Sequence, residues 1–191
     1  KGFSEFYGNI EDYVVLALLP SYLEREGSSL IYMVKDLIEL SNHPESGFYL
    51  HNHDELIAKL IALDEAGQNV ILIGVTFALL DLIEQHQFQL QHTIIMETGG
   101  MKGKRKEMIR EELHEQLCKG FGVSAIHSEY GMTELLSQAY SLGNGVFECP
   151  SWIQILVRDT EDALTYIADG KTGGINVIDL ANINSCSFIA T

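Results

Sequence analysis

Short apolar runs alternate with stretches of helical spacing between residues 12 and 127, and this alternation constrains the fold most. Buried strands of parallel sheets are continuously apolar because helices cover both faces of the sheet. The strand-like runs lie at 12–20, 48–50, 70–74, 93–97 and 124–127, and the helical stretches at 30–38, 56–63, 77–83 and 104–119. Strands and helices in this order form right-handed crossovers. We therefore predict an α/β fold with a largely parallel sheet flanked by helices.

The character of the chain changes after residue 142. Gly143-Asn144-Gly145 is typical of a hairpin turn, and strand-like segments follow at 146–149, 152–158 and 174–180. No helical spacing separates these segments, which favours antiparallel pairing. We predict two regions, an α/β subdomain at 1–142 and the beginning of a β-rich subdomain at 143–191.

Composition excludes several classes of protein. The chain has 191 residues and a formal net charge of −15, so a nucleic acid would be repelled at long range. No apolar run reaches the ~18 to 20 residues that span a bilayer, and no signal-peptide pattern is present. We expect a soluble, cytoplasmic protein without a nucleic-acid partner or a membrane span.

The cysteines and the chain ends carry two further expectations. Cys118, Cys149 and Cys186 are odd in number and widely spaced, which indicates buried thiols rather than disulfides or a zinc ribbon. Lys1 is not an initiator methionine, and the apolar run 187–190 ends at Thr191 without a polar tail. We expect the chain to be an internal fragment of a longer protein.

Residues 128–134, Ser-Glu-Tyr-Gly-Met-Thr-Glu, combine groups that suit a nucleotide with a metal ion. The Tyr130 ring can stack on a purine, and Gly131 lets the backbone approach a ligand. The Thr133 hydroxyl can bond a phosphate oxygen, and the Glu134 carboxylate suits Mg²⁺. The alternative is a turn followed by a short helix, with Thr133 as its N-cap and Glu134 in its first turn.

The run Tyr-Gly-Met-Thr-Glu at 130–134 resembles the signature of the adenylate-forming superfamily, which includes acyl-CoA synthetases, luciferases and nonribosomal adenylation domains. The wider segments 97–102 and 126–130 are most similar to one branch, the acyl-protein synthetases (LuxE-type) of bacterial bioluminescence and their relatives. The resemblance implies that Tyr130 lies against adenine, that Thr133 meets the phosphates and that Glu134 holds Mg²⁺. Thr133 and Glu134 are thus the implied catalytic residues.

The same resemblance implies the rest of a site. The implied nucleotide-binding residues are Gly99, Gly100, Ser128, Glu129, Tyr130, Gly131 and Met132. Tyr22, in the loop after the first strand, becomes a candidate wall of the acyl pocket, although a core or surface role is the simpler interpretation. The family's phosphate loop, ribose-binding aspartate and late lysine would lie outside this chain, and residues 143–191 would begin its β-barrel subdomain.

The implied function is ATP-dependent activation of a carboxylic acid, with Mg²⁺, as an acyl-adenylate and transfer of the acyl group to a thiol. The branch favours a fatty acid and a protein thiol as acceptor. Two alternatives stay open: an acyl-CoA ligase of the phenylacetate-CoA ligase type, with coenzyme A as acceptor, and a non-catalytic nucleotide-binding or interaction module.

Five of the twelve Lys and Arg residues lie between residues 102 and 110. We predict that Lys104, Arg105 and Lys106 occupy the first turn of a helix, where the helix dipole favours acidic side chains instead. Such a cluster can attract ATP or an acidic partner. The competing interpretation is a solvated face balanced by neighbouring glutamates.

Overall fold

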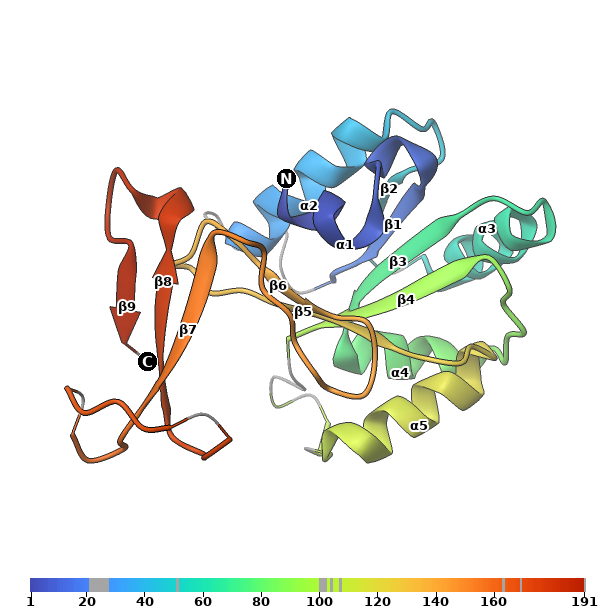
Figure 1. Cartoon of the computed structure of the whole chain (residues 1–191). Coiled ribbons are helices and arrows are strands. Elements are labelled where there is room, and N and C mark those ends of the chain that lie inside the picture. The colour runs from blue at the N-terminus through green and yellow to red at the C-terminus, as the bar shows by residue number, and fades with distance from the viewer. Residues whose placement is uncertain are drawn as a thin grey trace.

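The described part of the chain forms two sheets (Figure 1). The computed structural model describes residues 1–20, 28–50, 52–99, 103, 105, 106, 108–162, 164–168 and 170–190. The larger sheet has six strands in the order β2-β1-β3-β4-β5-β6, all parallel except β6, which runs antiparallel to β5. Its strands are β1 (Val14–Leu18), β2 (Gly47–Tyr49), β3 (Val70–Val75), β4 (Thr93–Thr98), β5 (His127–Tyr130) and β6 (Ala139–Ser141). The predicted largely parallel α/β sheet is confirmed.

Helices cover both faces of this sheet. In Figure 1, α1 and α2 lie above the sheet, and α4 and α5 pack together below it. The Ser28 side chain caps α2, because it accepts a hydrogen bond from the Ile31 amide at the start of the helix. The helices are α1 (Gly2–Tyr7), α2 (Ser29–Ser41), α3 (His53–Glu65), α4 (Thr76–Gln85) and α5 (Arg110–Phe121), with a short 3₁₀ helix at Ile10–Asp12.

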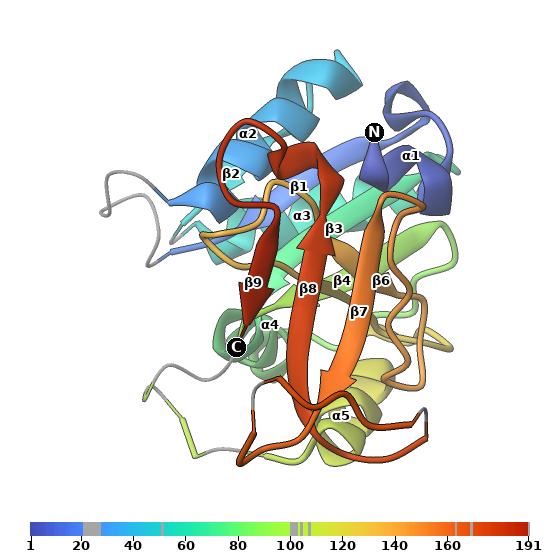
Figure 2. The same ribbon diagram turned by 60° about the vertical axis from the view of Figure 1, so that its left-hand side comes forward.

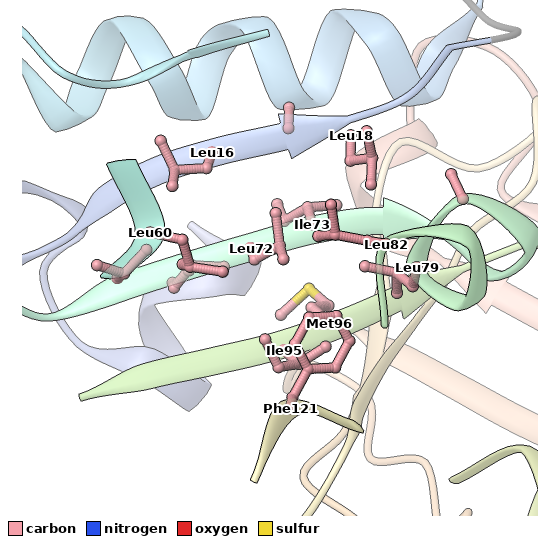
Figure 3. Packing of buried hydrophobic residues seen from close by; sticks show 14 of the residues in the cluster. Leu16, Leu18, Leu60, Leu72, Ile73, Leu79, Leu82, Ile95, Met96 and Phe121 are labelled. Carbon is pink, nitrogen blue, oxygen red and sulfur yellow. The ribbon is translucent and has the colours of Figure 1, made fainter. Parts of the chain in front are cut away.

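The core lies between the central strands and the helices (Figure 3). Every residue of β1 and β3 is buried, because helices cover both faces at the centre of the sheet. The close-up labels core residues from β1, β3, β4 and three helices: Leu16, Leu18, Leu60, Leu72, Ile73, Leu79, Leu82, Ile95, Met96 and Phe121. Strand β4, whose carboxyl end carries part of the candidate site, is therefore packed into this core.

Two predicted boundaries are wrong in position. A strand was predicted at 124–127, but β5 occupies His127–Tyr130, because these polar residues pair with β4 on one side and β6 on the other. The helix predicted from residue 104 begins at Arg110. Consequently, the residues predicted to follow the strand are partly within it, and the basic cluster precedes the helix.

The smaller sheet follows as predicted, with antiparallel strands side by side in Figure 2. The turn at Gly143–Gly145 contains backbone angles φ of 142°, 58° and 67° and reverses the chain, so that Glu148 bridges back to Tyr140 in antiparallel fashion. The predicted strand at 146–149 is reduced to this bridge. The strands are β7 (Ile153–Arg158), β8 (Gly174–Asp179) and β9 (Phe188–Ala190), with a 3₁₀ turn at Leu180–Asn182.

None of the helices in the described part of the chain has the length and apolarity that crossing a bilayer requires.

Candidate functional site

The carboxyl ends of β4 and β5 lie side by side at one edge of the larger sheet. Strands β4 and β5 are paired, with Glu97 opposite Ser128 and Thr98 opposite Glu129. The Thr98 hydroxyl donates a hydrogen bond of 2.6 Å to Glu129 Oε2. Gly99 follows β4 with φ of 67°, and the Thr76 hydroxyl at the start of α4 donates to its carbonyl. This edge is where parallel α/β sheets bind ligands.

Tyr130 ends β5 with a partly open ring. Its side chain is 37% exposed, and its ring centroid lies 6.2 Å from that of Phe147 at an interplanar angle of 71°. This edge-on contact supports the ring on one side and leaves surface for a ligand. Gly131 follows directly, and a Cβ at that position would lie 2.8 Å from Glu129 Oε1. A glycine therefore keeps the backbone and the glutamate close together.

An ion pair between a buried carboxylate and a partly exposed arginine lies under the same edge. The Glu97 carboxylate is 7% exposed and accepts hydrogen bonds from Arg110 Nη1 at 2.9 Å and from Thr76 Oγ1 at 3.3 Å. The same Arg110 nitrogen donates to Ser128 Oγ at 3.0 Å. His114 Nε2 lies 3.7 Å from Glu97 Oε1, too far for a hydrogen bond, and burial lowers the pKa of this histidine. The Ser128 side chain is therefore buried against α5 rather than open at the edge.

Glu129 lies on the opposite side of β5 from Ser128, as alternating strand residues do. Removal from solvent raises the pKa of its carboxyl group, the nearby Glu97 charge raises it further, and the hydrogen bond from Thr98 opposes this shift. The Glu129 charge in turn adds to the burial that raises the pKa of Tyr140. The surroundings of Glu129 therefore disfavour the charged form of its carboxyl group.

The loop after Tyr130 is held by the smaller sheet. Asp179, fully buried at the end of β8, accepts hydrogen bonds from the amides of Leu136 and Ser137 and from the Ser137 hydroxyl, at 2.9 to 3.1 Å. Asn182 Nδ2 donates to the Glu134 carbonyl at 2.6 Å. Backbone atoms of the loop are therefore fixed by side chains that lie more than 40 residues away in the sequence.

No helix follows this loop; the next element is β6, so the alternative with Thr133 as a helix cap is wrong. The side chains of Thr133 and Glu134 are exposed, while the Glu134 main chain is anchored. Within the described part of the chain, no hydrogen bond occupies the Glu134 carboxylate, and no three His, Cys, Asp or Glu side chains cluster as metal ligands. One free carboxylate fits Mg²⁺ that keeps several waters and shares phosphate oxygens.

The basic cluster does not lie in the first turn of α5, and that prediction is wrong. The first turn instead carries Glu111 and Glu112, which agree with the helix dipole. Arg105 precedes the helix and forms ion pairs with Asp81 and Glu84 of α4, and both partners raise its pKa. The Arg105 charge is thus neutralised by carboxylates of the same protein. Lys104 lies outside the described residues.

Two predicted site residues, Tyr22 and Gly100, also lie outside the described residues. Met132, within the loop after Tyr130, is half-buried. The cysteines are free, and Cys118 and Cys149 are half-buried, with burial raising the pKa of both thiols. Cys186 is exposed, which corrects the prediction that all three thiols are buried.

Sequence reasoning did not identify four residues that shape this edge: Glu97, Arg110, Phe147 and Asp179. The high density of basic residues between 102 and 110 was the one feature of the sequence that could have indicated Arg110, but it was interpreted as a cluster at 104–106. Phe147 and Asp179 occur in strand-like segments, where an aromatic and an acidic side chain have no distinctive pattern. Only the folded chain brings them to the motif.

The fold is similar to solved structures of three proteins. Apo MatB from Rhodopseudomonas palustris matches with a TM-score of 0.64 and 16% identity, over 92% of this chain and 33% of that chain. The long-chain-fatty-acid–CoA ligase FadD1 from Archaeoglobus fulgidus matches with a TM-score of 0.58 and 14% identity, over 88% of this chain and 34% of that chain. O-succinylbenzoate coenzyme A synthetase (MenE) from Bacillus subtilis, in complex with ATP and magnesium ion, matches with a TM-score of 0.61 and 18% identity, over 99% of this chain and 40% of that chain.

Comparison of the sequence with protein-family models and with curated proteins finds no match. At these identities the structural likeness shows a shared fold. The chain spans 33 to 40% of the length of these three proteins.

Proposed function

We propose that this chain is the adenine- and magnesium-binding part of an adenylate-forming ligase, which activates a carboxylic acid with ATP and passes the acyl group to a thiol. The observation that carries the proposal is the motif Tyr130–Glu134, which leaves the carboxyl end of β5 beside Gly99 at the end of β4. Two of the structures with this fold are acid–CoA ligases, and one of these holds ATP and magnesium ion. The resemblance of residues 130–134 to the superfamily signature supports the same assignment.

The residues have the following roles in this proposal. The partly open Tyr130 ring stacks on adenine, and the backbone at Gly99 and Gly100 passes close to the nucleotide. The exposed Thr133 hydroxyl donates to a phosphate oxygen. The Glu134 carboxylate holds Mg²⁺, whose positive charge offsets the negative charge that develops on the phosphates.

The reaction proceeds in two steps. An oxygen of the substrate carboxylate attacks the α-phosphorus of ATP, and the bond to pyrophosphate breaks, which gives an acyl-adenylate. A thiolate then attacks the acyl carbonyl carbon, and AMP leaves with the electron pair of the broken C–O bond. The anchored loop 131–138 contributes by keeping Thr133 and Glu134 in place while charge moves on the phosphates.

The acceptor thiol distinguishes two forms of the proposal. The resemblance of residues 97–102 and 126–130 to acyl-protein synthetases favours a fatty acyl group and a protein thiol. The shared fold with FadD1 and MenE favours coenzyme A. Incubation with a labelled acid and ATP, followed by separation of acyl-CoA from acylated protein, distinguishes the two acceptors.

Carboxylate-dependent exchange of labelled pyrophosphate into ATP tests the proposal itself. Because the chain spans 33 to 40% of the matched structures, the assay uses the longest natural polypeptide that contains it, with panels of fatty and aromatic acids. Exchange that requires a particular acid establishes adenylation and identifies the acid. Nucleotide binding without exchange for any acid would instead support a non-catalytic nucleotide-binding module.

Replacement of Glu134 tests the metal assignment. We expect Glu134→Ala to reduce the exchange rate by a factor on the order of 10² or more, as loss of a charge-stabilising group does. The decrease should be partly relieved at higher magnesium concentration. Glu112→Ala, at an exposed glutamate of α5, is the matched control and should keep the wild-type rate. An unchanged rate in Glu134→Ala would remove the role of this carboxylate.

A further inference from the structure

The buried charge of Glu97 raises the question of what Arg110 does at this edge. A carboxylate that is 7% exposed is costly unless a positive partner and hydrogen bonds accompany it, and Arg110 Nη1 lies 2.9 Å from Glu97 Oε1. The same nitrogen bonds Ser128 Oγ, which is fully buried on the next strand. Arg110 is therefore fixed at one end to both strands whose carboxyl ends form the candidate site.

The guanidinium group also reaches the loop between β6 and β7. Its central carbon lies 5.1 Å from the centroid of the Phe147 ring, within the range of a cation–π contact. Gly145 in the same loop allows this approach, because a Cβ there would lie 2.9 Å from Arg110 Cδ and its φ is 67°. The loop is thus shaped to pack against the arginine side chain.

Phe147 in turn contacts Tyr130 of the motif. Its ring lies 6.2 Å from the ring of Tyr130 at 71°, which is the favoured edge-to-face arrangement of two aromatic rings. A continuous series of contacts therefore runs from Glu97 through Arg110 and Phe147 to Tyr130. These residues come from β4, α5, the loop at 143–147 and β5.

We propose that Arg110 is a positioning residue for the nucleotide base: it holds Phe147 against Tyr130 and so fixes the orientation of the ring on which adenine stacks. This inference rests on the proposed function and assigns to Arg110 and Phe147 a role in affinity for the base. Arg110 acts through Phe147 and contributes no group to the phosphates. A fixed ring stacks without a further loss of side-chain freedom when the base binds.

The test measures KM for ATP and KM for pyrophosphate in the exchange assay, for the wild type and five variants. Arg110→Met and Phe147→Leu should each raise KM for ATP about 5- to 10-fold, from the typical strength of cation–π and aromatic contacts, with kcat nearly unchanged. KM for pyrophosphate, which has no base, should stay at the wild-type value. Arg110→Lys keeps the charge and should restore part of the affinity for ATP.

The double variant separates positioning from a general disturbance. Because Arg110 acts through Phe147, Arg110→Met combined with Phe147→Leu should raise KM for ATP no more than Phe147→Leu alone. Lys119→Met, at the exposed end of the same helix, removes a charge away from the site and should match the wild type. Where loss of Arg110 prevents folding by leaving Glu97 unpaired, Phe147→Leu leaves the ion pair intact and carries the test.

The outcomes are distinct. Wild-type KM for ATP in Phe147→Leu, or an equal increase in both KM values, overturns the role in base positioning and leaves the proposed ligase function standing. Additive effects in the double variant overturn the route from Arg110 through Phe147. A wild-type protein that neither exchanges pyrophosphate nor binds ATP in calorimetry overturns the proposed function, and this inference with it.

Discussion

The six-stranded sheet and the three-stranded sheet differ in how they are stabilised. All residues of β1 and β3 are buried between helices, whereas no residue of β7 is fully buried and Ile155 is 40% exposed. The smaller sheet contacts the motif loop through the polar side chain of Asp179 and through Asn182. The parallel sheet therefore depends on apolar packing, whereas hydrogen bonds join the smaller sheet to the motif loop. The site loop lies where these two kinds of stabilisation meet.

The largest expected effect is on the parallel sheet. Leu72→Ala removes a fully buried side chain at the centre of β3 and should lower the free energy of unfolding by about 2 to 5 kcal/mol. Ile155→Ala in the exposed sheet should lower it by less than about 1 kcal/mol, since much less area leaves water there. Chemical denaturation followed by circular dichroism compares the two variants. Equal losses would show that the smaller sheet has an apolar core of its own.

The junction between the sheets should show a smaller and local effect. Asp179→Ala leaves two loop amides and the Ser137 hydroxyl without their acceptor, which should cost about 1 to 3 kcal/mol. The amide protons of Leu136 and Ser137 should exchange faster with solvent, while those of β3 keep their protection. Hydrogen exchange measured by NMR gives both values.

The control for this junction is Asp162→Ala, at an exposed aspartate whose partners are local. It should leave the amides of the motif loop unchanged. Equal exchange rates of Leu136 and Ser137 in Asp179→Ala and the wild type would show that other contacts hold the loop.

The smallest expected effect is a change in stability with pH. It should concern the parallel sheet, because all seven histidines lie before residue 142. Burial lowers the pKa of His127, whose Nδ1 lies 3.1 Å from the Tyr7 hydroxyl. The unfolded chain, with a histidine pKa of about 6.5, then binds the proton more readily than the folded chain. The contribution of His127 to stability is therefore fully present above this pH and decreases as the pH falls below it.

His127→Gln can keep a hydrogen bond to Tyr7 and does not titrate. The loss of unfolding free energy between pH 7.5 and 5.5 should be smaller in this variant than in the wild type, as measured by denaturant titrations at both pH values. His114, whose pKa burial also lowers, and Glu129, whose raised pKa acts in the opposite direction, are present in both proteins and cancel in the comparison. An identical pH dependence would contradict the assignment.

Much of the parallel sheet was predictable because its central strands are continuously apolar, as at Val70–Val75. The polar strand β5 was misplaced because hydrogen-bonded neighbours, and not hydrophobic burial, make Ser128 and Glu129 extended. Helix α1 and strand β6 were not predicted, since both are short and depend on tertiary contacts such as the ring contact of Phe3 with Tyr140. The boundary between residues 142 and 143 stays a prediction.

The start of α5 shows the same limit. The helical spacing of apolar residues extended the predicted helix back to residue 104, but Arg105 pairs with Asp81 and Glu84 of α4, and the helix begins at Arg110. Ion pairs between distant segments leave no periodic signal. They compete with helix formation only after the chain has folded.

The sequence alone determined the class of sheet and the chemical groups of the motif at 128–134, since apolar periodicity and residue type are local properties. Tertiary structure decided which side chains support that motif. Arg110, Phe147 and Asp179 are remote from Tyr130 and Thr133 along the chain, and they reach the motif because strand pairing and the junction of two sheets place them there. Such contacts depend on the packing of whole elements, which the order of residues within any one segment does not specify.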